Sequence, residues 1–250
     1  MQHLNMNTQG SSQTVTVSFF RYEGKNKVWG MKQMKTVRAQ IRQMEGLEFF
    51  KPLGTGSGAG YSIWPDFSVF GLLAVWETEA MARQFLASKL FAQFVERTRE
   101  RYTIFLRPIS SRGSWSDFSS WRFIEPSPDN PLISALTRAT LKPRFLVKFW
   151  RMVPGVSTDH KEAPGLIFSK GIGEIPLMEQ ATFTIWENVE SMEAFAYKTR
   201  HAEAVHITRK KDGFREEMFT RLQPFDASGT WCGEDPLKPY FGIANTFLNI

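Results

Sequence analysis

The stretch "VFGLLAVWETEAMARQFLASKLFAQ" (69–93) decides the fold, because a related stretch, "ATFTIWENVESMEAFAYKTRHAEAV" (181–205), recurs in the second half of the chain. The Trp-Glu pair of the first copy aligns with a Trp-Glu pair in the second. Each copy ends on a proline followed seven residues later by a tryptophan, Trp115 and Trp231. Where the first copy has Leu90, the second has His201. A duplicated scaffold with a metal-capable side chain in one copy indicates a cofactor site built asymmetrically.

Each half predicts the element order strand, helix, strand, strand, helix, strand. Apolar side chains alternate along "TVTVSFFRY" (14–22), which is typical of a half-buried strand. A three- or four-residue apolar spacing then predicts an amphipathic helix that presents Val28, Met31, Met34, Val37, Ile41 and Met44 to the core. We expect one long helix at 79–99 and another at 189–211. This order is that of a ferredoxin-like unit, so the predicted fold is α+β, with two tandem ferredoxin-like repeats forming a dimeric-α/β-barrel-type fold within one chain.

Composition and turn residues give the expected domain boundaries. These are a disordered leader at 1–13, a first repeat at 14–110, a connection at 111–131, a second repeat at 132–237 carrying the cofactor ligand, and a tail at 238–250. In the second repeat, Pro154 and Gly155 are expected to end a helix that begins near Phe145. That ending leaves His160 in a solvated loop. The apolar tail favours either a membrane contact or a cap on the barrel.

The composition is that of an ordinary globular protein, with 42% apolar and 22% charged residues. Its 22 Phe and 8 Trp fit either a β-rich core or a cavity for a large apolar ligand. The single cysteine, Cys232, excludes an intramolecular disulfide and fits a reducing, cytoplasmic compartment. The sequence shows no apolar signal core and no apolar run long enough for a transmembrane helix. The net charge of +6 is scattered and lacks a nucleic-acid motif, so we expect no nucleic-acid partner.

The histidines are the candidates for metal chemistry. His3 lies in the leader, whereas His201 and His206 share the last long helix. Five residues at about 100° each separate those two side chains by roughly 140° around the helix axis. The sequence also lacks the HExxH spacing of zinc sites, so a mononuclear zinc or two-histidine iron site is disfavoured.

Haem needs only one protein ligand, because the porphyrin supplies the other four nitrogens. His201 suits that role, since small and apolar residues continue its helical face; a partly buried structural histidine is the alternative. His206, beside Arg209 and Lys210, belongs with the solvated face, although the choice of ligand between the two stays open. The basic residues Arg112, Lys51 and Lys170, near glycine turns, are either partners for haem carboxylates or ordinary surface charges.

Several separated blocks together resemble the spheroidene monooxygenase family of carotenoid oxygenases. They include "FKPLGTGSGAG" (50–60), "FLRPISSRGSWS" (105–116), "FWRMVPGVS" (149–157) and "TFTIWENVESMEAFA" (182–196). The resemblance extends over about residues 14–237. It implies a dimeric α/β barrel with b-type haem (iron), bound through His201, and carries over Arg112 and Trp115 as motif residues of unassigned role.

The resemblance also implies an activity. A relative of these enzymes would use O2 and a reduced ferredoxin-type donor to oxidise carbon 2 of an acyclic carotenoid to the hydroxy and then the keto product. Because such a substrate resides in a bilayer, peripheral contact with the inner face of the membrane is expected. A monomer and a homodimer both fit. The alternatives are a haem dehydratase or peroxide-using enzyme on the same barrel, or a non-enzymatic haem- or lipophile-binding protein.

Overall fold

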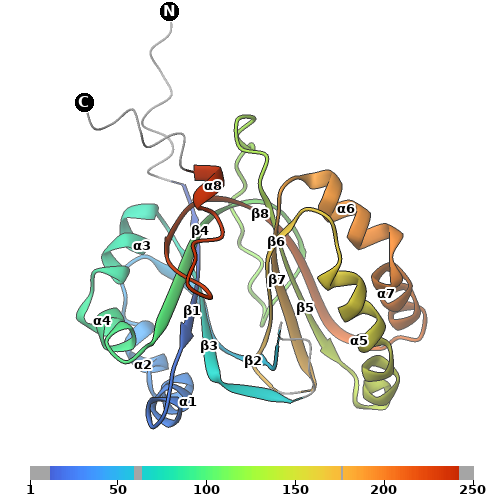
Figure 1. Cartoon of the computed structure of the whole chain (residues 1–250), viewed down its shortest axis with the longest axis horizontal. Coiled ribbons are helices and arrows are strands. Elements are labelled where there is room, and N and C mark those ends of the chain that lie inside the picture. The colour runs from blue at the N-terminus through green and yellow to red at the C-terminus, as the bar shows by residue number, and fades with distance from the viewer. Residues whose placement is uncertain (1–11, 59–63, 176, 242–250) are drawn as a thin grey trace, which may run out of the picture.

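The computed structural model describes residues 12–58, 64–175 and 177–241 and shows a closed barrel of eight antiparallel strands (Figure 1). The strands are β1 (Thr14–Arg21), β2 (Leu47–Gly56), β3 (Pro65–Trp76), β4 (Glu100–Gly113), β5 (Ile133–Leu141), β6 (Leu166–Gly173), β7 (Glu179–Trp186) and β8 (Phe214–Gly229). Around the barrel their order is β1-β3-β2-β6-β7-β5-β8-β4. The predicted barrel with outer helices is therefore confirmed.

The two halves of the chain each contribute four neighbouring strands in the same relative order, β4-β1-β3-β2 and β8-β5-β7-β6. Two seams join the halves. The β4–β8 seam is long and runs from Tyr102–Gly229 to Gly113–Met218. The β2–β6 seam, over the described residues, pairs Gly54 with Gly173 and Thr55 with Ile172 alone.

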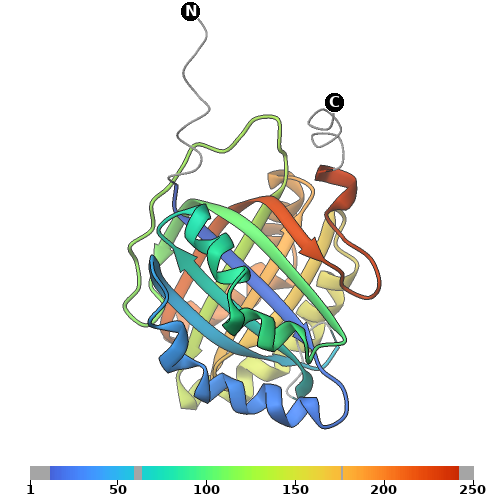
Figure 2. The same ribbon diagram turned by 90° about the vertical axis from the view of Figure 1, so that its left-hand side faces the viewer.

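The helices cover the outside of the barrel. They are α1 (Asn26–Thr36), α2 (Arg38–Ile41), α3 (Glu79–Leu86), α4 (Lys89–Val95), α5 (Leu146–Lys161, preceded by a 3-10 turn at Pro143–Phe145), α6 (Val189–Lys198), α7 (Arg200–Lys210) and α8 (Lys238–Phe241). The first four flank one half and α5–α7 the other, while α8 lies at one end (Figure 1). Figure 2 looks onto the first half and shows its helices in front of the strands. Within the described residues, no helix combines the length and apolar character needed to cross a bilayer.

Strand alternation divides the side chains into a barrel interior and an outer face. In β1, Val15, Val17 and Phe19 belong to the interior cluster, whereas Phe20 packs outward beneath the helices. Trp115 joins the same interior cluster, so the aromatic residues of the connection at 111–131 are partly core. The interior is thus filled by side chains.

Both predicted long helices are wrong in one respect, because each is broken near its middle. Ser88 begins α4 by accepting a hydrogen bond from the Phe91 amide at 3.2 Å. Thr199 begins α7 in the same way, accepting from the His201 amide at 3.2 Å. Side-chain capping of this kind competes with continued helix and starts a new one.

The helix predicted for residues 28–44 also differs from the expectation. It breaks at Val37, and Val28 and Met31 are exposed instead of buried. The inward face carries Trp29 and Gly30, and a Cβ at Gly30 would lie 2.8 Å from the Tyr22 ring. The prediction is confirmed for Met34, Val37, Ile41 and Met44, which pack in the outer cluster of the first half. Only at the first turns does the close approach of the Gly30 backbone to the Tyr22 ring turn Val28 and Met31 outward.

The expected helix end at Pro154 is wrong, since α5 continues through this proline to Lys161. A proline removes one backbone donor, but contacts of α5 with α7, and of Val156 with the buried cluster around Trp186, offset that loss. His160 consequently lies in the last turn of α5 and is 3% exposed, not solvated.

The ends of the chain bear on two further expectations. Gln13, assigned to the disordered leader, is buried and donates to the Ser120 carbonyl at 3.1 Å. In the tail, Phe241 packs against the interior cluster at the end of the barrel. The rest of the leader, with His3, and residues 242–250 lie outside the described residues.

Candidate functional site

A cavity of about 730 Å³ lies between the outer face of the second-half sheet and helices α5, α6 and α7. Such a volume is within the range of sites for small-molecule ligands and cofactors. Its lining is mainly apolar or small, with a few polar groups: Phe149, Met152, Val153, Val156, Trp186, Met192, Phe195, Ala196, Ala202, Ala204, Val205, Phe214, Met218 and Phe219 form the apolar part. The cavity therefore suits a large, mostly apolar ligand.

The sheet floor of this cavity is open because its residues are small where the first half has rings. Phe20 pairs with Phe70 six positions along the ladder from Trp76, and both rings are buried under the first-half helices. In the second half, the pair six positions along the ladder from Trp186 is Ala139 and Gln180. Both of these residues line the cavity.

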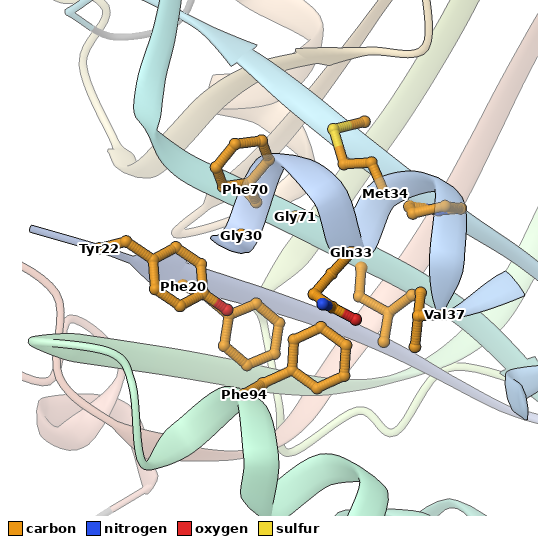
Figure 3. A pocket seen from close by; sticks show the side chains of 11 residues that line it. Phe20, Tyr22, Gly30, Gln33, Met34, Val37, Phe70, Gly71 and Phe94 are labelled. Atoms are coloured by element: carbon orange, nitrogen blue, oxygen red, sulfur yellow. The ribbon is translucent and has the colours of Figure 1, made fainter. Parts of the chain in front are cut away.

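The helices that cover the two sheets show the same replacement of rings by small side chains. Counting from Leu90 and its counterpart His201, the first-half residues Phe91 and Phe94 correspond to Ala202 and Val205. The two phenylalanines pack against Phe20, with ring centroids 5.7 and 5.4 Å apart. A residual void of about 20 Å³ remains in the first half, and Figure 3 shows the rings of Phe20, Phe70 and Phe94 around it. Replacing large side chains with small ones thus opens a cavity in one half only.

His201 sits in the first turn of α7 and lines the cavity. Its Nδ1 lies 3.3 Å from the Ala196 carbonyl oxygen, a contact in which the protonated Nδ1 donates. That tautomer leaves the Nε2 lone pair for a metal, since ligating histidines commonly donate their other ring N–H to a carbonyl. Burial lowers the pKa of His201, and the bond to Ala196 opposes that effect only in part, so the neutral form is favoured.

His160 is a second buried histidine in the cavity wall, and it was missed in the sequence because a proline precedes it. Its ring centroid lies 4.8 Å from that of Phe195 and 6.0 Å from that of Trp186. Phe195 in turn lies 5.2 Å from His201. Burial, and secondarily the nearby His201, lower the pKa of His160 to about 4. It is therefore a neutral imidazole at physiological pH.

Three other polar residues line the cavity as well: Arg112, which was predicted at the site, and His206 and Arg209, which were not. His206 is exposed at the edge, consistent with the solvated face predicted for it. Arg112 lies with its Cζ 5.5 Å from the centroid of Phe219. Arg209 donates from Nη2 to Glu217 at 3.1 Å. Arg112 and Arg209, together with Arg138, thus add guanidinium groups to the polar part of the lining, and such groups suit ligand carboxylates.

The structure does not bring Lys51 and Lys170 to this cavity, which corrects their expected grouping with His201. Both side chains point into the barrel interior, the opposite side of the sheet from α5–α7. Lys51 donates to the Glu174 carboxylate at 2.8 Å, and Trp115 Nε1 donates to the other oxygen of that carboxylate at 2.8 Å. Lys170 donates to the Gly58 carbonyl at 2.9 Å. Successive side chains of a strand point to opposite faces of the sheet, and this alternation decides where the two lysines lie. Their closeness to glycine turns in the sequence carries no information on the face.

No three His, Cys, Asp or Glu side chains gather into a metal-binding group within the described ranges. The donor set at the cavity is instead single imidazoles, His201 and His160, each on its own helix. The sequence did hold a signal for the cavity itself: beyond the change of leucine to histidine, the copies differ by the loss of two phenylalanines in the following turn.

Comparison with solved structures supports the fold. The barrel superposes on an aldoxime dehydratase with a TM-score of 0.58 at 11% identity, covering 86% of this chain and 82% of that one. A second aldoxime dehydratase structure, with butyraldoxime bound, gives the same TM-score at 12% identity. At this level of identity the likeness concerns the fold alone.

Comparison with known sequences gives the family. No family model matches the chain. It is, however, 36% identical over 228 residues to the spheroidene monooxygenase of Rhodobacter capsulatus, covering 89% of this chain and 94% of that protein. It is 34% identical to the enzyme of that name from Cereibacter sphaeroides and 35% identical to the one from Rubrivivax gelatinosus. The chain therefore belongs to the spheroidene monooxygenase family.

Proposed function

We propose that this protein is a haem-dependent monooxygenase that oxidises carbon 2 of an acyclic, spheroidene-like carotenoid. The observation that carries the proposal is the cavity of about 730 Å³, with a neutral, carbonyl-anchored His201 in its wall, in a chain of this family. The proposal treats the halves as tandem ferredoxin-like repeats, of which the first serves as scaffold and the second holds the site.

The residues present fit a haem. His201 would hold the iron through Nε2, and its neighbours along α7, Ala202 and Val205, have small side chains that would leave room for a flat macrocycle. Arg112 and Arg209 border the same cavity and would pair with the propionates. When bound, the haem supplies the activation of dioxygen for C–H oxidation.

The protein's own contribution is to bind the carotenoid and to exclude water. Apolar lining residues such as Phe149, Met152 and Val153 on α5 offer a slot that matches a polyene chain. One O2 and two electrons with two protons convert the CH2 at carbon 2 into an alcohol and release one water. A second round gives a geminal diol, which loses water to give the ketone.

Reduced ferredoxin is the electron donor in this proposal, on the cytoplasmic side of the membrane. The net charge of +6 supports it, because ferredoxin-type donors are acidic and opposite charge accelerates encounter. Electron transfer then requires no cofactor in this chain besides the haem.

The decisive experiment compares His201→Ala with His206→Ala, two cavity-lining histidines five residues apart on α7. In the purified native protein we expect a Soret band and one haem per chain by the pyridine haemochrome method. Loss of the ligand should reduce haem affinity beyond the roughly tenfold effect typical of losing an outer-shell partner. The His206 variant should keep its haem and spectrum.

Activity is tested separately by supplying spheroidene with ferredoxin, its reductase and O2, and analysing the products by chromatography. We expect 2-hydroxy and 2-keto products from the native protein and neither from His201→Ala. If His201→Ala retains full haem occupancy with an unchanged spectrum, the ligand assignment is wrong. A haem-loaded protein that yields no oxygenated product from any acyclic carotenoid would exclude the oxygenase.

A further inference from the structure

Most of the large apolar side chains exposed at the surface lie at one end of the barrel. Of the ten that the described residues expose, seven belong to this end: Val28, Met31, Trp64, Phe67, Val147, Ile175 and Leu177. The other three, Phe123, Tyr197 and Tyr240, lie in the connection, on α6 and on α8. Scattered exposed apolar residues are normal on a soluble protein, whereas a gathered set marks an interaction surface.

Strand register places the tips of two hairpins together at this end. Gly56 pairs with Pro65 at the end of the β2–β3 hairpin, and Gly54 pairs with Gly173 across the short seam. Trp64 and Phe67 follow from the first tip and are 71% and 57% exposed, and Ile175 follows from the second. The opposite end of the barrel, where Thr14 pairs with Trp76, carries α8 and is capped by Phe241.

Two helices begin at the same end and add both apolar and basic groups. Helix α1 starts shortly after β1 ends and exposes Val28 and Met31. Residues 25–44 contain no acidic side chain but six basic ones: Lys25, Lys27, Lys32, Lys35, Arg38 and Arg42. Helix α5 exposes Val147, Lys148 and Arg151.

The acidic groups at this end are only partly neutralised: Asp66, between Trp64 and Phe67, accepts hydrogen bonds from the Ser68 amide and hydroxyl, with no ion pair among the described residues. Glu23 pairs with Arg99, and Asp212 accepts from Lys142 at 2.6 Å and from Arg144 at 2.7 Å. The lysines of α1 are exposed around the apolar side chains. Apolar residues ringed by uncompensated positive charge are the composition of a surface that binds anionic lipid.

Part of the cavity wall lies at the same end. Phe214 lines it and pairs with Leu141, the last residue of β5. Phe149, one turn after Val147 on α5, lines it too. The exposed Leu177 is attached to α5, because its carbonyl accepts from Trp150 Nε1 at 3.1 Å. Exposed apolar surface and cavity are therefore continuous along α5.

From this we propose that the barrel end formed by Trp64, Phe67, Ile175, Leu177, Val28 and Val147, the docking end, binds the surface of an anionic lipid bilayer. The apolar side chains would enter the headgroup region while the lysines of α1 contact lipid phosphates. Docked this way, the part of the cavity wall formed by Phe149 and Phe214 lies on the bilayer side, which would shorten the path of an apolar polyene from lipid to protein. This last role rests on the proposed function; the docking itself does not.

Vesicle co-sedimentation of the full-length protein tests the docking end. Vesicles of phosphatidylcholine alone are compared with vesicles that also contain phosphatidylglycerol. We expect stronger binding to the anionic vesicles, weakened by salt. The triple variant Trp64→Ser, Phe67→Ser, Ile175→Ser should lose at least about tenfold in partitioning, through lost apolar insertion. Lys32→Gln should lose about fivefold on anionic vesicles only.

The matched control is Phe123→Ser, which removes a 52% exposed aromatic residue that lies off the docking end. It should bind vesicles like the native protein. Circular dichroism and haem content should be unchanged in every variant, since all these side chains are exposed. Native-like binding by the triple variant, or an equal loss in the control, refutes the proposal.

Two further readouts separate this proposal from its competitors. If the native protein ignores vesicles and light scattering shows a dimer that the triple variant dissociates, the docking end is an interface between copies and the membrane proposal is wrong. Vesicle binding is measured without carotenoid or O2. His201→Ala should therefore bind vesicles normally, and binding that persists while oxygenase activity is absent in the native protein would refute the proposed function alone.

Discussion

Acidification should destabilise the native state of this protein through one buried histidine, His160. Its ring is 3% exposed and packs against Phe195 and Trp186, in surroundings that disfavour a positive charge. Burial lowers its pKa from 6.5 to about 4. The unfolded chain therefore binds a proton below about pH 6.5, whereas the native state does so only near pH 4. Stability from this group is complete above pH 7 and is lost as the pH falls between those values.

The magnitude follows from the two pKa values. One pKa unit corresponds to about 1.36 kcal/mol, so the complete loss amounts to about 3 kcal/mol. Integrating the proton binding from about pH 7.5 to about pH 5 gives a loss of about 2 kcal/mol over that interval. Against a typical domain stability of about 5–15 kcal/mol, an effect of this size is readily measured.

The assay is urea unfolding of the haem-free protein at both pH values, for the native chain and for His160→Leu. The variant differs in absolute stability for packing reasons, so only the change with pH is compared. We expect the free energy of unfolding to fall about 2 kcal/mol less in the variant than in the native protein. The exposed His206→Leu serves as the control and should keep the native pH dependence. The same pH dependence in His160→Leu and the native chain would refute this reasoning.

Two further predictions concern the barrel interior and the cavity. Glu174→Gln should lower the free energy of unfolding by about 3 kcal/mol, because it leaves the Lys51 ammonium buried without a carboxylate; the double variant Lys51→Met, Glu174→Leu should recover most of that loss in urea titrations. Ala204→Phe should reduce haem affinity by more than about tenfold in a Soret titration while leaving the melting temperature unchanged or higher, because the ring fills an existing cavity. A melting temperature that drops together with haem affinity would show that Ala204 faces packed protein instead.

The sequence predicted the barrel because its strands are regular and its copies agree at the tryptophans. Alternation along β1 and the repeated Trp-Glu pairs were enough to predict the order of elements along each half and a barrel with its helices outside. Helix boundaries were less predictable. Thr199 caps a new helix, and α5 passes through Pro154, since local propensity there yields to side-chain capping in one case and to packing in the other.

The site was predictable only for residues that differ between the copies. His201 stood out against Leu90, and the structure places it in the wall of the cavity. Lys51 and Lys170 were grouped with it by distance along the chain, which carries no information on which face of a strand a side chain takes. His160 was not predicted as a site residue, because its burial depends on α5 continuing past Pro154, where the sequence predicted the helix to end.

The two seams that join the halves of the barrel differ in length, and this difference decides where the barrel would open first. The β4–β8 seam holds the halves together along its whole length, whereas the described part of the β2–β6 seam is two residue pairs beside the hairpin tips of the docking end. Breaking few hydrogen bonds costs less than breaking many, so we expect any opening of the barrel to begin between β2 and β6, with β4–β8 as the hinge. Such an opening would loosen the second-half sheet where it lines the cavity. The first half, with its packed aromatic rings, would stay rigid.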